Sequence, residues 1–593
     1  MNILVFVVLM PMLFSLLCFG FKKGAGPLAL ITNALLCLLA VYIFATGVVV
    51  SEFMSLTAYG FNAGIYLMAM LLSFLMVLYS LKFMEDKERL AEYYGYILIT
   101  LGATAGALFA NNYITLLVFW GVLATTLYLL MGIEGPAANA SAKKTFIIIG
   151  AADALMIIGI GIILMLNQNL QIFGNTLVLN NSLAVLAFLC LGAGALAKAG
   201  AIPFHTWIPD SSVFAPVSVM AFLPAALDKL LGIYLFTRLC LEVFKLEPNS
   251  ALSLFLLALG SLTIIIGVMA ALVQHNLKKL LSFHAVSQVG YMIIGIGSGM
   301  PVAIAGGIFH MFNNVIYKPL LFLAGGAIEK QTGTTELNRL GGLSRSMPIT
   351  FGAALIAALA ISGVPPLNGF MSKWMIYQGI IGLSKISPFW IIWLVAAMFG
   401  SALTLASFIK IIHAAFLGQG SEETERAKEV SWQMWLPMTV LAALCVVFGL
   451  FAYGLPLSYL VLPAVSGLTY IGFWNPLIAT MVILLALIFG LLIFYLKNRV
   501  EQPVAKAIYI GGELLEEKTV KVSGIDFYNN IKEMGPLPDL YQMAEKRNFD
   551  LYEVTKNFSL KLSQFLSWMH NGLLHTYLAW MFLGMIILFW ILK

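Results

Sequence analysis

Apolar stretches of about 20 residues, the length that an α-helix needs to cross the hydrocarbon core of a bilayer, recur along this whole sequence. The 593 residues are 61% hydrophobic and only 10% charged. Soluble domains carry about 25% charged residues, and so few charges cannot cover this much apolar surface in water. The chain is therefore predicted to be an all-α integral membrane protein with about sixteen transmembrane helices. The expected spans are 2–20, 26–50, 63–83, 92–110, 112–132, 141–167, 181–203, 214–243, 249–273, 280–299, 302–327, 346–380, 387–417, 432–453, 473–496 and 571–592.

Several kinds of chemistry are excluded by motifs that the sequence lacks. The five cysteines stand alone in apolar runs, with no C-x-x-C and no Cys/His cluster, so iron–sulfur or zinc ligation is not expected. There is no Walker loop and no nucleotide-binding fingerprint. We therefore expect no cofactor, no metal and no redox chemistry in this chain itself, and the net charge of +6 is explained by membrane topology and not by a nucleic-acid partner.

Basic residues lie asymmetrically in the loops between the expected spans. Fourteen fall on one side of the membrane and three on the other, which predicts that the richer side is cytoplasmic. Both termini are then outside, and the polar segment 498–570 is cytoplasmic. The cytoplasmic set is Lys22, Lys23, Lys82, Lys87, Arg89, Lys143, Lys144, Lys278, Lys279, Lys330, Arg339, Arg345, Arg426 and Lys428, and the opposite set is Arg238, Lys245 and Lys385.

The polar segment ends in a stretch, 537–569, with apolar residues three and four positions apart and charged residues between them. This spacing predicts an amphipathic helix. A helix of this kind between two spans either lies along the membrane surface or against neighbouring helices, or it forms a small cytoplasmic cap. The apolar set is Leu540, Ala544, Leu551, Val554, Phe558, Leu562, Phe565 and Met569.

Two spans carry a glycine and a proline at matching places. One reads LAKAGAIPFHTWIPDSSVFAP (196–216) and the other LAISGVPPLNGFMSKW (359–374). Gly200 and Pro203 align with Gly363 and Pro366 at one offset of 163 residues. Interrupted helices in corresponding halves of a membrane protein indicate a transport site between repeats, although two incidental proline kinks are the simpler alternative.

Charged and titratable residues occur inside the expected spans, where each costs at least about 2.5–3.5 kcal/mol at the bilayer centre. Such residues need partners, water or a function. Lysine suits a proton relay because its proton affinity responds strongly to burial and to a nearby carboxylate, and histidine titrates near neutral pH. The candidate proton or ion relay residues are Lys198, Lys229, Asp228, His310, Lys318, Lys373, Asp153 and Lys410.

These candidates differ in how well a structural role explains them. Asp153 is either a relay member or a structural hydrogen-bonding group, and Lys410 either belongs to the relay or extends to the membrane interface. Asp228 need not pair with Lys229, because adjacent residues of a helix point in different directions. His310, Asn314 and Lys318 are spaced four apart and share one helix face.

Four stretches make the sequence recognisable: AKAGAIPFHTWIPDSSVFAPVS, KKLLSFHAVSQVGYMIIGIG, GGIFHMFNNVIYKPLLFLAGGAI and TGTTELNRLGGLSRSMPITF with ISGVPPLNGFMSKW. They strongly resemble the antiporter-like subunits of respiratory complex I, Mrp cation/proton antiporters and membrane-bound hydrogenases. The resemblance implies two inverted five-helix repeats, each with a broken helix, and assigns the family's relay residues to Lys198, Lys229, His310, Lys318 and Lys373. The expected divisions are 1–90 (N-terminal helices), 91–245 and 246–418 (the two repeats), 419–497 (additional helices), 498–570 (amphipathic segment) and 571–593 (C-terminal anchor).

The C-terminal part resembles the long antiporter-like subunits of energy-converting group 4 hydrogenases and formate hydrogenlyase-type complexes. The stretches IYIGGE, DFYNNIKEMGPL, LYQMAEKRNFDLYE and HNGLLHTYLAWMFLG carry this similarity. It implies membrane subunits of a redox complex as partners, and indirectly soluble hydrogenase or iron–sulfur subunits.

One residue departs from the family pattern. Most relatives carry a glutamate after a Phe-Trp pair in the fifth span, where this chain has Gly121. Asp153 or Glu134 is a possible replacement, and Asp153 is favoured because its span neighbours the broken helix. Asn314 stands where many relatives have histidine, and asparagine can hold water but cannot titrate.

Three hypotheses follow. The leading one is a proton-translocating subunit of a redox-driven complex in the cell membrane. The second is a sodium/proton antiporter module, and the third is a structural membrane-arm subunit whose relay has decayed, which the departure at Gly121 favours and the retained lysines oppose.

Overall fold

The computed structural model describes residues 2–21, 24–465, 467–470, 474–497, 525 and 528–592. The chain divides into two units, 1–529 and 530–593, which are treated separately. Lys22, Lys23 and the stretch IYIGGE lie outside the described residues.

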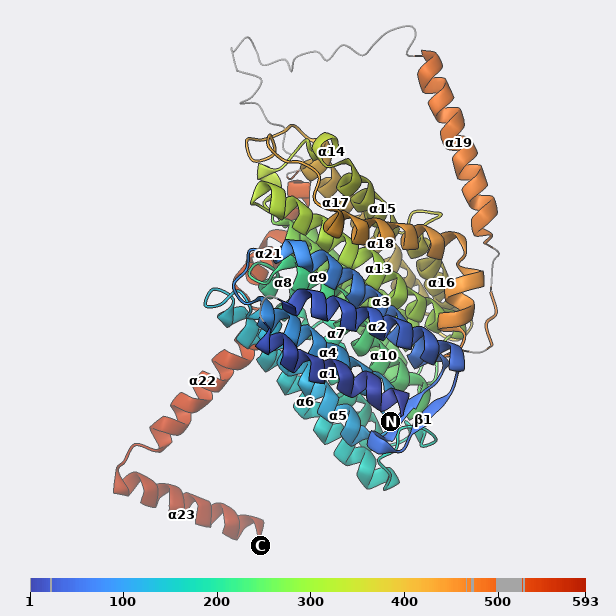
Figure 1. Ribbon diagram of the computed structural model, residues 1–593. Helices are drawn as coiled ribbons and strands as arrows, with labels where there is room; N and C mark the ends of the chain where they lie inside the picture. Colours follow the sequence, from blue (N-terminus) through green and yellow to red (C-terminus); the bar gives the residue numbers. More distant parts are fainter. Residues whose placement is uncertain are drawn as a thin grey trace. The chain divides into compact units, whose positions relative to one another are not determined.

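The first unit is a bundle of long helices (Figure 1). Its first part comprises α1 (Ile3–Gly20), α2 (Ala25–Thr46), α3 (Gly60–Phe83), α4 (Leu90–Phe109), α5 (Tyr113–Met131), α6 (Asn139–Asn167), α7 (Ser182–Ala199), α8 (Trp207–Ser212), α9 (Val217–Phe222) and α10 (Asp228–Arg238). The later helices are α11 (Ala251–Leu272), α12 (Leu277–Gly297), α13 (Pro301–Thr332), α14 (Leu343–Ser346), α15 (Pro348–Ser362), α16 (Asn368–Gly382), α17 (Trp390–Ile412), α18 (Trp432–Leu450) and α19 (Pro476–Lys497).

Strands are few and short in the described residues. The strand β1 (Val49–Ser51) pairs with β2 (Leu56–Ala58) in an antiparallel hairpin. The strand β3 (Leu177–Val178) lies parallel to β4 (Phe244–Lys245). Both pairs lie in connections between helices, and only a few of their residues, such as Leu56 and Phe244, are buried in the core.

Thirteen helices of the described residues are long and apolar enough to cross a membrane. The remaining expected spans are occupied by α4, by α13 and by the two halves α15 and α16. The prediction of an all-helical, multi-pass membrane protein is confirmed.

Both predicted breaks are present, and their backbones match. Helix α7 ends at Gly200 with φ +81°, and α15 ends at Gly363 with φ +83°. In each case the N–H groups of the glycine and of the next residue donate hydrogen bonds to carbonyls in the last turn of the helix. The second of these bonds measures 2.9 Å from Ala201 to Leu196 at the first break, and 3.0 Å from Val364 to Leu359 at the second. This left-handed cap satisfies carbonyls that would otherwise be exposed in the membrane, so glycine is required at both places.

Two of the helices that carry intramembrane charges are buried along most or all of their length. Every residue of α10 is buried, as is every residue from Val302 to Ile328 of α13. In contrast, α19 is apolar on all sides and almost wholly exposed. Polar residues are therefore gathered on helices that other helices surround.

The second unit contains three helices of interest, α21 (Leu537–Glu545), α22 (Leu551–Met569) and α23 (Leu574–Ile591). The sequence predicted one amphipathic helix over 537–569, and the structure interrupts it. Arg547 adopts φ +61°, and the side chain of Asp550 accepts a hydrogen bond of 3.1 Å from the N–H of Tyr552. Asp550 thus caps the start of α22. The apolar spacing continues across this cap, so spacing alone predicted a single helix.

Candidate functional site

Lys198 lies in the last turn of α7 and meets a carboxylate from α10. Its Nζ lies 3.8 Å from Oδ1 of Asp228, and both side chains are buried. Neither Lys198 Nζ nor Asp228 Oδ2 has a hydrogen-bond partner among the described residues. This buried pair therefore leaves the Lys198 ammonium and one carboxylate oxygen of Asp228 able to form further hydrogen bonds.

A second carboxylate approaches Lys198 less directly. The indole N–H of Trp120 donates to Oδ1 of Asp153 at 3.0 Å, and the ammonium of Lys198 lies 4.9 Å from the centre of the Trp120 ring. Glu134 instead pairs with Lys87 at 3.0 Å, in the connection after α5. The carboxylate that pairs with Lys198 is therefore Asp228, while the favoured candidate Asp153 binds Trp120, whose ring lies beside Lys198.

Lys229, the neighbour of Asp228, turns toward the broken helix. Its ammonium donates to the carbonyl oxygen of Ala199, the last residue of α7. A Cβ at Gly200 would lie 3.4 Å from this ammonium and 2.1 Å from the side chain of Ile208. The glycine of the break therefore leaves room for Ile208, which packs beside the lysine.

Lys373 repeats this arrangement at the second break. Its ammonium donates to the carbonyls of Ile361 at 2.9 Å and Ser362 at 3.5 Å, at the end of α15. The C-terminal end of a helix carries a partial negative charge. At each break this end points at a buried lysine. The two halves thus share one local design.

The predicted polar face of α13 points into the bundle. His310 contacts Ser372 at 2.9 Å through Nδ1 and Gln288 at 3.1 Å through Nε2, and Asn314 donates to the carbonyl of Ala225 at 3.5 Å. Lys318 has no hydrogen-bond partner among the described residues. Its ammonium faces the rings of Phe322 and Phe408, at 5.9 and 5.8 Å.

The relay candidates form a series between the two breaks. Asp228, the partner of Lys198, and Lys229 lie on α10, which packs against α13. Lys318 and His310 lie on α13, which packs against α16, where Lys373 binds the end of α15 at the second break.

Lys410 binds the end of α11. It is buried, and its ammonium donates to the carbonyls of Leu272 and Gln274 at 2.8 and 2.9 Å, at the end of α11. It caps this helix. On the same helix as Lys410, Ser407 contacts Nε2 of His284 at 2.7 Å.

A cluster of hydroxyl groups lies near Lys373. Its side chains are uncharged, so the prediction from intramembrane charges and histidines did not include it. Tyr291 of α12 and Tyr377 of α16 both contact the hydroxyl of Ser401 on α17, at 2.9 and 2.6 Å. The only signal in the sequence is the spacing of Lys373 and Tyr377 by four residues on one helix face.

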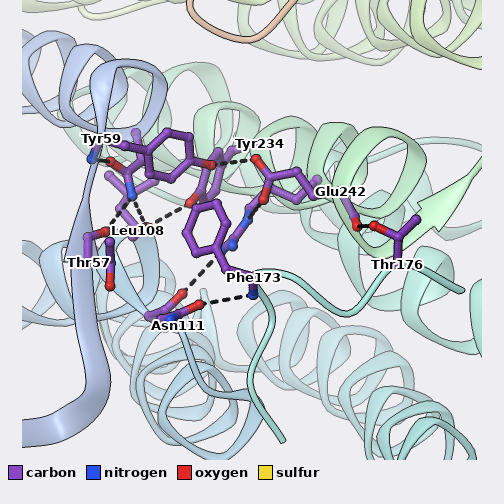
Figure 2. Close-up of polar contacts among 11 residues, drawn as sticks. Thr57, Tyr59, Leu108, Asn111, Phe173, Thr176, Tyr234 and Glu242 are labelled. Carbon is purple, nitrogen blue, oxygen red and sulfur yellow. Dashed lines mark hydrogen bonds and ion pairs between the residues drawn. The ribbon is translucent and has the colours of Figure 1, made fainter. Parts of the chain in front are cut away.

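A different polar cluster closes the far end of α10 (Figure 2). Arg238 is buried, pairs with Glu242 at 2.7 Å and donates to the carbonyl of Ala110 at 3.0 Å. The hydroxyl of Tyr59 donates to Glu242 at 2.6 Å, and the guanidinium faces the ring of Phe173 at 4.9 Å. This cluster ties three connections between helices to the end of α10.

The multi-pass bundle, its two matching breaks and the lysine at each break define the class of antiporter-like membrane subunits. Residues 110–404 match the family described as NADH:quinone oxidoreductase/Mrp antiporter, transmembrane region. This region is about half of the chain, and the match confirms the resemblance noted in the sequence.

The curated relatives include Na(+)/H(+) antiporter subunit A1 of two staphylococci. The protein of Staphylococcus aureus strain MRSA252 is 31% identical over 422 residues, which are 67% of this chain and 52% of that protein. That of Staphylococcus haemolyticus strain JCSC1435 is 32% identical over 421 residues, again 67% and 52%. The chain spans about half the length of these relatives.

Solved structures share the fold at lower sequence identity. A chain of the membrane-bound sulfane sulfur reductase, an archaeal respiratory membrane complex, aligns over 100% of both chains with a TM-score of 0.83 and 23% identity. The Mrp complex of Dietzia sp. DQ12-45-1b gives 0.71 and 22%, over 78% of this chain and 96% of that one. Respiratory complex I of Thermus thermophilus gives 0.66 and 21%, over 78% and 100%.

Proposed function

We propose that this chain translocates protons as the antiporter-like subunit of a redox-driven complex, through a relay of lysines, histidine and water. The observation that carries the proposal is the buried Lys198–Asp228 pair with its unpartnered atoms. Buried polar groups without protein partners are usually hydrogen-bonded to internal water. Such groups recur along the series, at Asn314 Oδ1 and Lys318 Nζ, which supports a hydrated path through the bundle.

The energetics of the pair suit this role. At 3.8 Å and an effective dielectric constant of about 20, two unit charges attract by about 4 kcal/mol. Moving one charge against about 100 mV costs about 2.3 kcal/mol. Separation of Lys198 from Asp228 therefore removes more stabilisation from the ammonium than the transfer costs, so its proton affinity falls and the proton can leave; the return of Asp228 favours reloading.

We place the loading side at the cytoplasm, following the distribution of basic residues. Lys198 and Lys229 then load from the cytoplasmic side, and His310, Lys318 and Lys373 connect to the outside. Asp153 positions Trp120 beside Lys198, and Lys410 holds the end of α11. The chain lies in the cell membrane with both termini outside.

The proposed partners are other membrane subunits of the complex, with soluble hydrogenase or iron–sulfur subunits beyond them. The solved structures that share this fold belong to multi-subunit membrane complexes. The segment 537–569 is proposed to clamp a neighbouring membrane subunit. Identification of the chains that co-purify with this one tests the assembly directly.

Replacement of Lys198 by alanine tests the transport function. The complex, with its co-purifying subunits, is reconstituted in vesicles, an imposed potassium diffusion potential drives protons, and a dye reports internal pH. We expect proton flux to be lost in Lys198→Ala and kept in Lys245→Ala, a matched control at an exposed lysine. Undiminished flux in Lys198→Ala would favour the structural-arm hypothesis.

A sodium/proton antiporter is the second candidate, because the curated relatives are named Na(+)/H(+) antiporter subunits. The same vesicles distinguish the two functions when a sodium gradient is imposed in place of the electrical potential. Proton movement that follows the sodium gradient supports exchange, and flux that is insensitive to sodium supports the proton relay.

A further inference from the structure

The start of α15 is held by a residue from a distant part of the chain. Helix α15 begins at Pro348, and Met347 before it forms no side-chain cap. Glu429, in the connection between α17 and α18, supplies the acceptors instead. One of its carboxylate oxygens accepts hydrogen bonds from the N–H groups of Ile349 and Thr350 at 2.7 and 3.2 Å, and the other accepts from the Thr350 hydroxyl at 2.6 Å. A carboxylate satisfies the free N–H groups at a helix start and is favoured by their partial positive charge.

The first broken helix is capped by its own neighbour in sequence. Asn181 directly precedes α7, and its side-chain oxygen accepts a hydrogen bond of 2.7 Å from the N–H of Ala184. This is a local cap. The two breaks therefore share their lysine sites but differ at the starts of their helices, because the start of α15 depends on a residue 80 positions later.

The connection between α17 and α18, residues 418–430, is also fixed to the segment that precedes α15. The hydroxyl of Ser421 donates to the carbonyl of Arg339 at 2.6 Å, and the side chain of Arg339 pairs with Glu423 at 2.8 Å. A Cβ at Gly341 would lie 1.9 Å from a backbone carbonyl oxygen of this connection, so the two backbones touch there. Helix α15 itself packs against α17 and α18. The connection and the start of α15 therefore form one unit.

The other end of α15 binds the lysine of the second break. The carbonyls of Ile361 and Ser362 accept hydrogen bonds from the ammonium of Lys373. The helix has 15 residues and spans about 22 Å at 1.5 Å per residue. Its backbone hydrogen bonds fix this rise, so a displacement of the start along the helix axis reaches the end. The depth of the two carbonyls in the bundle thus depends on where the start of α15 is held.

We propose that Glu429 is a positioning residue for Lys373, because it holds the start of α15 and so places the carbonyls that bind the ammonium. This inference rests on the proposed proton transport. Arg426 and Lys428 of the same connection belong to the basic set that predicts the cytoplasmic side. A movement of residues 418–430 on that side then shifts the carbonyls relative to Lys373 and changes the stabilisation of its charge. Only hydrogen bonds change in this step.

The test compares two glutamates of this connection in the reconstituted complex. Glu429→Gln keeps the length of the side chain but removes its charge and one of the two oxygens that accept hydrogen bonds. Glu425→Gln is the matched control, at an exposed glutamate four residues earlier. We expect Glu429→Gln to lower proton flux about tenfold, equivalent to about 1.4 kcal/mol, and Glu425→Gln to keep it. Thr350→Val removes one of the three bonds from the other partner, so it should cause a smaller loss and add little to Glu429→Gln.

Hydrogen–deuterium exchange in the assembled complex separates positioning from local capping. Loss of a local cap raises exchange at the first turn of α15. Loss of position is expected to raise it also at the far end, 359–364, while the middle of the helix, 354–357, stays protected. The same measurement on Lys373→Met and on the double variant completes a cycle. Changes more than about 7–10 Å apart normally add, so a double effect at 359–364 that is smaller than the sum is expected if Glu429 acts on the carbonyls that bind Lys373.

The outcomes distinguish this inference from the proton function. Exchange that rises only at the first turn or along the whole helix, or effects of Glu429→Gln and Lys373→Met that add, would overturn the positioning role. Full flux in Glu429→Gln together with none in Lys373→Met would refute its part in transport and leave the proton function standing. If Lys198→Ala and Lys373→Met both keep full flux, the proton function fails, and the transport role of Glu429 fails with it.

Discussion

Replacement of Asp228 by asparagine is the most direct probe of the central pair. Asparagine keeps the shape of the side chain and removes its charge, so the change acts on the 3.8 Å interaction with Lys198 and leaves packing intact. The attraction of about 4 kcal/mol at this distance corresponds to about a thousandfold in an equilibrium or rate, at 1.4 kcal/mol for each factor of ten. Because the surroundings relax, we expect a loss of proton flux of at least about 100-fold.

The assay is proton flux in reconstituted vesicles, with assembly of the complex checked by size-exclusion chromatography. Two comparisons separate charge from structure. Asp228→Glu keeps the carboxylate and should retain most of the flux. Asp153→Asn should have a smaller effect, because Asp228 pairs with Lys198 at 3.8 Å whereas Trp120 lies between Asp153 and Lys198. Full flux in Asp228→Asn, or equal losses in the asparagine and glutamate variants, would refute a switching role for the pair.

Three further predictions concern the framework around the relay. Lys410→Met leaves two carbonyls at the end of α11 without their donor, which costs about 1–3 kcal/mol per buried group; it should lower the midpoint of thermal unfolding, and an unchanged midpoint would contradict the capping role. Gly363→Ala forces a side chain into a backbone with φ +83°, at a cost of about 1–2 kcal/mol, and should lower the midpoint. Gly121→Ala, inside α5 where a Cβ meets nothing within 4 Å, should not lower it. Deletion of 537–569 should loosen assembly, measured by the recovery of co-purifying subunits, before it alters transport; an intact complex without transport would overturn this assignment.

The matching lysine sites at the two breaks explain why the glycines and lysines occur together. A helix that ends inside the membrane exposes carbonyl groups and a partial negative charge. Lys229 and Lys373 are bound to those carbonyls, so each break both requires a cation and holds it at membrane depth. A break without its lysine, or a lysine without its break, would leave one polar group unsatisfied in an apolar surrounding.

Much of this architecture was predictable from local sequence. The length of each apolar stretch predicts the spans, and a glycine followed three residues later by a proline predicts the two breaks. Both features depend only on residues within one or two helical turns. The shared face of His310, Asn314 and Lys318 follows from helical spacing alone. The class of protein follows from the same features together.

Contacts between distant segments depended on the tertiary structure. Local spacing cannot show that Asp228 and not Asp153 meets Lys198 directly, that Lys410 caps a helix 138 residues earlier, or that Tyr291 and Ser401 meet across 110 residues. These contacts are decided by how buried helices pack, since a residue's position along a helix specifies its face and its depth but not the helix that lies opposite. The sequence by itself determined which groups enter the membrane, and the fold decided which of them meet.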